Sequence, residues 1–317
     1  MKKFIFKIGV YGILLALGME LLVRVFHLHN ERPERYLDEL QVEKWVPNQT
    51  GLSVTGNRKQ NVGKYRINQI GFNSVYDTYI PQDDELDVAL VGDSFIEGFH
   101  QDYDRSLGQK VERLLDNRVK VFEYGYAGYD LADQLHLIKT YDSIFKKIDY
   151  TVIYMRFTDD LTRDTYAVSE RLSLNTPVNR ILKEIKTVVY LKDVGLFDPI
   201  TQTMGSLMSL IKGGAKQPTN ISKPDPDKVN AKRLENFKRL VAEYGFDKDK
   251  NILLLDARLC SEEFLDYLKK NGFKTLDFSK AFEASKTPTD LNYDQHWNDH
   301  GRELLAQLIA DYVKSKM

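Results

Sequence analysis

The chain has 317 residues, of which 42% are hydrophobic and 29% charged, and this composition is typical of globular proteins rather than disordered chains. Lys and Arg number 45 against 46 Asp and Glu, which argues against a nucleic-acid-binding surface, since such a surface needs a basic excess. The single cysteine, Cys260, excludes an internal disulfide and any paired-cysteine metal or redox motif. The mean hydropathy of −0.42 excludes a polytopic membrane protein but leaves room for one apolar segment.

That segment lies at the N-terminus. Three lysines stand among the first seven residues, and residues 4–26 are long enough to cross a hydrocarbon core, which needs about 20 residues. Glu20 and Arg24 stand four residues apart near its end, where they can pair at the membrane interface. No small-residue cleavage site follows, so residues 1–28 are predicted to be a retained membrane anchor rather than a cleaved signal peptide or a buried core helix.

The orientation of the anchor is less strongly marked, because Arg24, Arg32 and Arg35 on the far side nearly match the basic residues on the near side. A short tail inside and a large domain outside is the usual arrangement for a signal anchor. We therefore expect the rest of the chain on the extracytoplasmic side.

Residues 29–82 are polar and irregular, and we interpret them as a connector. From residue 83 to residue 317, short apolar strands alternate with helical patterns, which predicts a three-layer α/β/α domain with a mainly parallel sheet. The predicted strands are residues 84–91, 119–122, 150–155, 251–255 and 273–278; the predicted helices are residues 105–117, 131–147, 228–244, 261–271 and 299–313.

The alternation is interrupted by an insertion at about residues 165–227. This stretch is weakly patterned, and its glycines and prolines at 213–227 indicate a loop. Two interpretations stay open: a lid over one end of the sheet, or an ordinary exposed excursion.

Polar or glycine-rich sequence follows three of the predicted strands. Gly92-Asp93-Ser94 follows the first, residues 123–128 follow the second, and residues 156–160 follow the third. Ligands of doubly wound sheets collect beyond the carboxyl ends of the strands, so we expect these segments to meet at one site.

Ser94 has the setting of a nucleophile, because it follows a strand and precedes a turn toward a helix. A serine needs a base to take its proton, and Asp294 and His296 supply a carboxylate and an imidazole from one short segment. Each motif alone is commonplace, since Gly-Asp-Ser occurs in ordinary turns and Asp294 and His296 would suit a helix cap and a surface histidine. Their order and strand-end placement together indicate acyl chemistry. Ile96 excludes the Gly-x-Ser-x-Gly elbow of α/β-hydrolases.

With these motifs in place, the sequence resembles the SGNH (GDSL-like) hydrolase superfamily, and within it the membrane-anchored subgroup similar to polysaccharide O-acetyltransferases and esterases. The resemblance extends from about residue 68 to residue 313 and is carried by the segment at Ser94, the Asp294-x-His296 segment and, more softly, the segment ending at Gly128. It implies a five-stranded flavodoxin-like sheet, with Ser94 as nucleophile, His296 as base and Asp294 orienting the base. It also implies that the backbone N–H groups of Ser94 and Gly128 bind the oxyanion, and it implies no metal and no cofactor.

Two positions depart from the family pattern. Thr158 stands where an asparagine amide normally helps to bind the oxyanion, and we predict that its hydroxyl takes this role. Glu123 stands where the second block usually has asparagine, and we expect it to point away from the site. Further pocket or supporting roles are predicted for Asp93, Asp159, Arg156, Trp297 and Asn298.

Other residues have competing interpretations. Asp294, His296 and His300 could in principle bind a metal, but no fourth ligand with matching spacing is evident, and we expect no metal. His100 is interpreted as a loop residue that could line the pocket.

The leading functional hypothesis is a membrane-anchored serine esterase or O-acyltransferase that forms an acyl-serine on a cell-envelope glycan or a similar ester. Expected partners are that substrate, the membrane and a polytopic membrane O-acyltransferase, with no nucleic acid. The alternative is a catalytically weakened glycan-binding or assembly protein of the same fold, for which Thr158 and Glu123 are the evidence. A third hypothesis, a structural membrane partner, has only the anchor and the insertion to support it.

Overall fold

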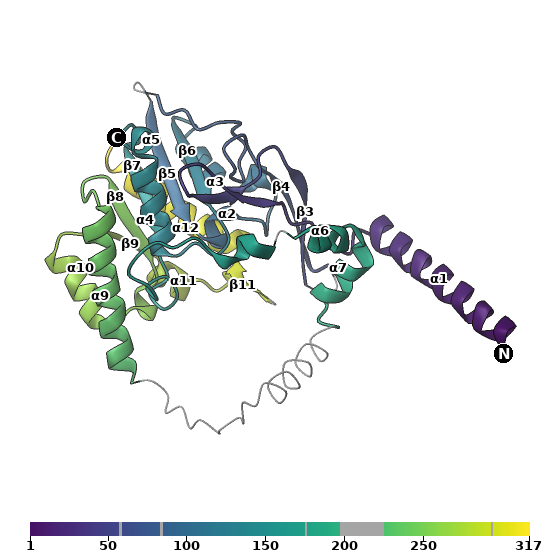
Figure 1. Cartoon of the computed structure of the whole chain (residues 1–317). Helices are drawn as coiled ribbons and strands as arrows, with labels where there is room; N and C mark the ends of the chain where they lie inside the picture. Colours follow the sequence, from purple (N-terminus) through teal and green to yellow (C-terminus); the bar gives the residue numbers. More distant parts are fainter. Residues whose placement is uncertain (57–58, 83–84, 175, 197–224, 293) are drawn as a thin grey trace. The chain divides into compact units, whose positions relative to one another are not determined.

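The computed structural model describes residues 1–56, 59–82, 85–174, 176–196, 225–292 and 294–317 (Figure 1). The chain divides into two compact units. The first contains residues 1–32, 52–62 and the described residues from 170 to 196; the second contains residues 33–51, 63–169 and the described chain from 225 onward.

The second unit is built on a five-stranded sheet whose strands are all parallel, in the order β6-β5-β7-β8-β9. This order is flavodoxin-like, and the predicted fold class is confirmed. The register places Gly92 opposite Gly125, so the first two motif-bearing strands end side by side. The strands are β5 (Leu86–Gly92), β6 (Val119–Gly125), β7 (Tyr150–Tyr154), β8 (Asn251–Leu255) and β9 (Lys274–Asp277).

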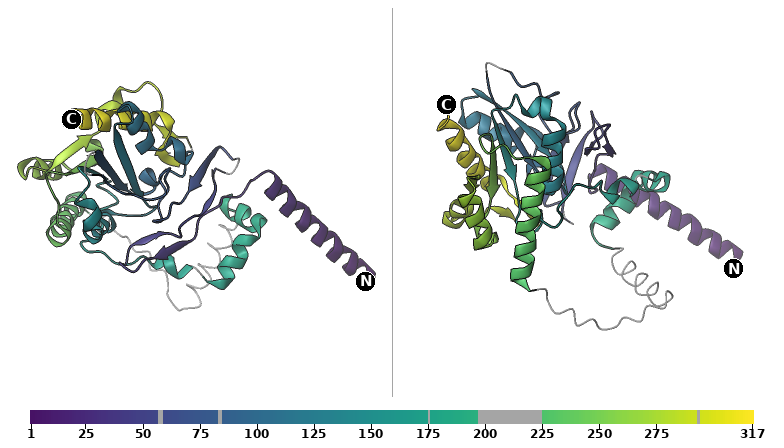
Figure 2. Two further views of the ribbon diagram at one scale, coloured as in Figure 1. Left: turned by 90° about the horizontal axis from the view of Figure 1, so that it is seen from above. Right: turned by 60° about the vertical axis from the view of Figure 1, so that its left-hand side comes forward.

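Helices cover both faces of this sheet, which gives the three layers, as Figure 2 also shows. On one face, Val91 and Ile153 belong to the same buried core as Phe237 of α9. On the other face, Leu90 belongs to the same buried core as Leu305 of α12. The α-helices of this unit are α2 (Ser94–Glu97), α3 (Leu107–Leu114), α4 (Leu131–Thr140), α5 (Asp142–Phe145), α9 (Pro226–Tyr244), α10 (Glu262–Lys270), α11 (Ser279–Ala284) and α12 (Asp299–Lys314), and its short 3-10 helices are η1 (Tyr103–Arg105) and η3 (Ala257–Leu259).

The helix predicted at residues 131–147 is interrupted. Helix α4 ends at Thr140 and α5 begins at Asp142, with Tyr141 between them. The Tyr141 hydroxyl bonds to Asp38, and it accepts a hydrogen bond from Lys44 at 2.5 Å. These tertiary contacts are invisible to helical periodicity.

The segment expected to be an irregular connector contains four short strands. It forms the antiparallel pair β1 (Arg35–Leu37) and β2 (Glu43–Trp45), and a second two-stranded sheet of β3 (Thr50–Thr55) and β4 (Asn61–Arg66). Its side chains Trp45, Ile67, Phe72 and Tyr79 are buried in the core of the second unit. These apolar residues have no regular spacing, so the sequence carries no periodic signal of their burial.

The first unit contains α1 (Lys2–Val25), which is long and apolar enough to cross a membrane. Its polar end packs against α7 (Lys186–Asp193), and Arg24 donates to the carbonyl of Glu184 at the end of α6 (Pro177–Glu184) at 2.6 Å. Both helices lie at the start of the insertion and follow the 3-10 helix η2 (Glu170–Leu174). Glu20 accepts hydrogen bonds from the backbone N–H groups of Lys186 at 3.0 Å and Thr187 at 2.8 Å. Arg24 bonds to Glu20 at 2.7 Å, so the predicted pair forms. Residues 197–224, which include most of the loop predicted at 213–227, lie outside the described residues.

Candidate active site

Ser94 is placed by the end of β5 and the start of α2. Asp93 caps this short helix, its Oδ1 accepting from the backbone N–H of Phe95 at 2.9 Å. Ser94 is half-buried, and its Oγ lies 2.7 Å from Nε2 of His296. A residue 202 positions away in the sequence is thus in hydrogen-bond contact with the serine.

His296 lies on β11 (Asp294–Trp297), which pairs with β10 (Asp290–Leu291). Nδ1 of His296 bonds to Oδ1 of Asp294, and the backbone N–H of His296 donates to the same oxygen at 3.2 Å. With the Nδ1 proton directed at the carboxylate, Nε2 is left as the acceptor for the Ser94 hydroxyl. Burial acts to raise the pKa of Asp294, but the hydrogen bond and charge of His296 outweigh it, and the pKa is lowered. The carboxylate is therefore ionised at neutral pH.

Trp297 and Asn298 directly follow His296 in the chain and support this strand. The buried Trp297 ring contacts Phe95 and Tyr154, each with ring centroids 4.7 Å apart. Asn298 caps α12 by accepting from Gly301 at 2.9 Å, and its amide donates to the carbonyl of Pro288 at 2.7 Å. These contacts fix the chain directly after His296.

The loop after β6 approaches Ser94 from the neighbouring strand. The backbone N–H of Tyr126 donates to the carbonyl of Gly92 at 3.1 Å. Gly125 allows the close approach, since a Cβ there would lie 2.1 Å from the backbone nitrogen of Glu97. Gly128 has a φ of +92°, which favours glycine. Its role as an oxyanion donor stays a prediction.

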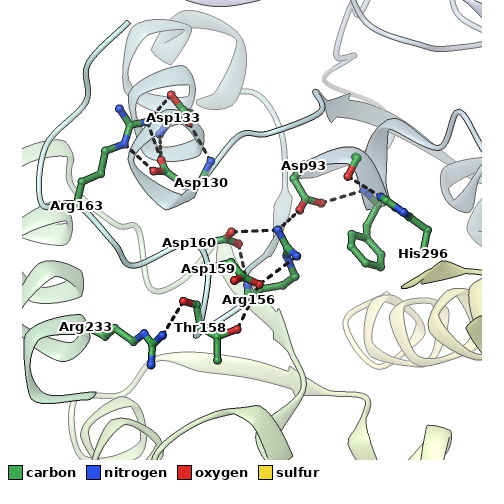
Figure 3. A network of polar contacts seen from close by, with 12 residues as sticks. Asp93, Asp130, Asp133, Arg156, Thr158, Asp159, Asp160, Arg163, Arg233 and His296 are labelled. Atoms are coloured by element: carbon green, nitrogen blue, oxygen red, sulfur yellow. Dashed lines mark hydrogen bonds and ion pairs between the residues drawn. The ribbon is translucent and has the colours of Figure 1, made fainter. Parts of the chain in front are cut away.

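Arg156, after β7, joins a network of carboxylates (Figure 3). Its Nη2 lies 3.0 Å from Oδ2 of Asp93 and 3.8 Å from Asp160, and its Nη1 lies 3.1 Å from Asp159. Burial raises the pKa of both Asp93 and Asp160, and the Arg156 charge opposes that rise. The guanidinium also lies 5.5 Å from the centre of the Phe95 ring. Arg156 thus helps to hold the segment that carries Ser94.

Thr158 is not brought to Ser94. Its hydroxyl donates to Asp159 at 3.2 Å, and its carbonyl accepts from Arg233 at 2.8 Å. Figure 3 shows Thr158 beyond Arg156 as seen from His296. The adjacent carboxylate is a strong local acceptor, which explains why the short threonine side chain turns to it rather than to the serine.

Glu123 is fully buried, and its carboxyl accepts from the backbone N–H of Gly108 on α3 at 2.9 Å. Burial raises its pKa to about 7. The Glu123 carboxyl is therefore hydrogen-bonded to α3, in keeping with the expectation that it points away from the site.

One supporting residue, Glu97, escaped the sequence reasoning, and another, His100, was expected only as a loop residue that could line the pocket. The buried Glu97, three residues after Ser94, accepts from the indole N–H of Trp45 at 2.6 Å. Nε2 of His100 lies 3.1 Å from Oδ2 of Asp294. An acidic residue directly after Phe95 and Ile96 was the available signal for the first, because a buried carboxyl needs partners.

A metal ligand set is also conceivable from the geometry. His100, Asp294 and His296 offer ligand atoms within 4.8 Å of one another. Both histidines already bond to the Asp294 carboxylate, so a metal would have to displace these hydrogen bonds. His300, the ligand considered from the sequence, instead lies 2.9 Å from the hydroxyl of Ser285.

Comparison with known proteins gives structural neighbours only. No protein-family model and no curated protein matches the chain. A lipase/acylhydrolase from Enterococcus faecalis aligns with a TM-score of 0.42 and 14% identity, over 73% of this chain and 96% of the other. A carbohydrate acetylesterase from Sinorhizobium meliloti aligns with a TM-score of 0.40 and 9% identity, over 74% and 100%. A G-D-S-L lipolytic family member from Veillonella parvula aligns with a TM-score of 0.39 and 14% identity, over 71% and 97%.

These similarities are at 14% identity or below. Since these TM-scores are below 0.5, the functional assignment rests on the geometry around Ser94.

Proposed function

We propose that the chain is an ester hydrolase or O-acyltransferase of SGNH type that uses Ser94 as its nucleophile. The observation that carries the proposal is the contact of 2.7 Å between the Ser94 hydroxyl and Nε2 of His296, whose Nδ1 bonds to Asp294. This arrangement has the three roles that serine acyl chemistry needs: a nucleophile, a base to take its proton, and a carboxylate to orient the base.

In the acylation step, Ser94 Oγ attacks the ester carbonyl carbon while its proton passes to Nε2 of His296. The negative charge on the carbonyl oxygen is held by the backbone N–H groups of Ser94 and Gly128. The tetrahedral species then collapses, the alcohol leaves with the proton from His296, and the acyl group stays on Ser94. Asp294 stays ionised throughout and stabilises the imidazolium.

In the second step, a hydroxyl attacks the acyl-serine, and His296 again takes its proton and returns it to Ser94. Water as the attacking group gives hydrolysis, whereas a sugar hydroxyl gives O-acyl transfer. Both outcomes use the same residues, so the reaction class is defined by acyl-serine formation and the acceptor is a separate question.

The proposed location is the membrane, with α1 as an anchor and the domain on the extracytoplasmic side. Support comes from the length and apolar surface of α1 and from the pairing of its charged residues Glu20 and Arg24 at its polar end. A membrane-tethered site favours an acylated envelope glycan as substrate and a polytopic O-acyltransferase as partner. Membrane fractionation tests the anchor, because an integral protein resists alkaline extraction and needs detergent for release.

The alternative, a weakened glycan-binding or assembly protein, has one specific observation in its favour. The Thr158 hydroxyl is bonded to Asp159, so this side chain does not supply the oxyanion donor that the family pattern predicts. Loss of one such donor typically costs about 10²–10³ in rate. Saturable glycan binding without acyl exchange would favour this alternative.

The deciding experiment is reaction of the full-length chain in detergent with a fluorophosphonate, read by intact mass. We expect one adduct, absent in Ser94→Ala and retained in the matched control Ser315→Ala, which alters an exposed serine near the C-terminus. Folded wild-type protein that forms no adduct would contradict the esterase proposal.

A further inference from the structure

Asp294 is bonded by two histidines, one at each carboxylate oxygen. Its Oδ1 bonds to Nδ1 of His296, and its Oδ2 lies 3.1 Å from Nε2 of His100. His100 comes from the loop after α2, the helix that begins at Ser94, so the carboxylate is held from the nucleophile side of the site as well as from its own strand. A carboxylate bonded at both oxygens has little freedom to rotate.

The ring of His296 is also held between two other rings. The His100 ring stacks on it at 4.0 Å with an interplanar angle of 24°, and the Phe95 ring stacks at 4.4 Å with an angle of 29°. Two rings cannot share one face at these distances, so they cover opposite faces. The imidazole can move little other than in its own plane, which contains both Asp294 and the direction of Ser94.

The charge state of His100 suits this place. Burial lowers its pKa to about 4, and the nearby His296 and Arg302 act in the same direction, while the Asp294 charge acts against them. At neutral pH His100 is therefore uncharged. A neutral ring can donate one N–H to Asp294 without repelling the positive charge that forms on His296 during proton transfer.

We propose that His100 is a positioning residue that acts through Asp294 and His296: its N–H fixes the second carboxylate oxygen, and its ring fixes the imidazole against Ser94. This inference deepens the proposed function and rests on it for its effect on rate. The arrangement itself can be tested without any substrate.

Removing the N–H of His100 should have two consequences for the Asp294 carboxylate. Oδ2 of Asp294 loses its donor, so the carboxylate rotates more freely and His296 is less often aligned with Ser94. The carboxylate then keeps its bonds to Nδ1 and the backbone N–H of His296, but its orientation is no longer fixed from the nucleophile side of the site.

The two contributions of His100 can be separated by substitution. His100→Phe keeps a stacking ring but has no donor, whereas His100→Gln places an amide N–H near the Nε2 position but has no ring. His100→Leu is a second donor-free variant in case the phenylalanine variant does not fold. His136→Phe is the matched control, since His136 stacks on Tyr166 in another part of the domain.

Two measurements on the full-length chain in detergent test the proposal. The rate of fluorophosphonate reaction should fall about tenfold in His100→Phe and His100→Leu, the cost of losing a hydrogen bond to a charged group. His100→Gln should recover most of this loss, and His136→Phe should leave the rate unchanged.

The second measurement is the proton NMR signal of the His296 Nδ1–H, recorded at one fixed pH and assigned with His296→Ala, which reports its hydrogen bond to Asp294. We expect this signal to shift or broaden in the donor-free variants and to stay near its wild-type position in His100→Gln. An unchanged signal and an unchanged rate in folded His100→Phe would overturn the proposal. If the wild type does not react with the probe but the signal still moves, the proposed function fails while the positioning of His296 by His100 stands.

Discussion

Oε1 of Glu97 accepts a hydrogen bond from the backbone N–H of Ala127 at 3.0 Å. Glu97 lies three residues after Ser94 in α2, and Ala127 is adjacent to Gly128. One buried carboxyl group therefore ties the helix that carries the nucleophile to the loop predicted to bind the oxyanion. The same oxygen also accepts from Trp45, which belongs to the segment before the sheet.

Glu97→Gln should flatten the pH dependence of stability. Burial raises the pKa of Glu97 from 4.5 to about 8, so the folded state keeps a proton that the unfolded chain has lost. Between these two pH values the native state binds more protons, and the contribution of Glu97 to stability is lost as pH rises. Gln can accept the same hydrogen bonds without titrating. Denaturant unfolding across this window should show a smaller decline in the variant.

The pH dependence of wild-type stability alone is not sufficient for this test. Burial also raises the pKa of Glu123, to about 7, so the contribution of Glu123 to stability likewise falls as pH rises. The comparison is therefore the difference between wild type and Glu97→Gln. A difference that does not vary with pH would show that Glu97 stays ionised in the fold.

Gly128→Ala should lower the rate of acylation strongly, whereas Thr158→Val should leave it nearly unchanged. The φ of +92° at Gly128 is strained for alanine by about 1 kcal/mol or more, so the loop must shift away from Ser94. We expect Gly128→Ala to lower the rate of acylation at least tenfold, as for a displaced oxyanion donor. Thr158→Val should change it by less than about threefold, because its hydroxyl bonds to Asp159. Stopped-flow acylation with an aryl ester would measure both, and a large loss in Thr158→Val would place its hydroxyl in the oxyanion site.

Arg156→Met should destabilise the fold through Asp93. The Asp93 side chain is buried, and Arg156 lies 3.0 Å from it, so the substitution leaves a buried carboxylate without its counter-charge. We expect a loss of about 2 kcal/mol, below the cost at a fully buried pair because the Arg156 side chain is 34% exposed. The loss should be smaller at about pH 4 than at about pH 8, since Asp93 can take up a proton in acid.

A double-mutant cycle with Asp93→Asn tests the cause of that loss. If the ion pair is responsible, Arg156→Met should cost much less in the Asp93→Asn background than in the wild type. Additive losses in urea unfolding would instead indicate that Arg156 acts through its packing on Phe95.

Sequence patterns anticipated the parallel sheet well, because its central strands contain continuous apolar runs such as residues 252–255 and the intervening helices are amphipathic. The segment before the sheet was missed, since Trp45 and Tyr79 are buried by contacts that have no local period. The break at Tyr141 was missed for the same reason. Hydrophobic periodicity in the sequence predicts helices and strands, whereas the burial of irregular segments depends on contacts with distant parts of the fold.

The sequence by itself determined the reactive groups of the site, because Ser94, His296 and Asp294 can be read from short motifs whose chemistry depends on residue type. Only the tertiary structure decided which neighbours complete the site. It directs Thr158 to Asp159 and brings His100 to Asp294, 194 residues away in the chain. The reason is physical: side-chain direction and competition among nearby acceptors depend on packing between distant segments, and neither is encoded in a local pattern.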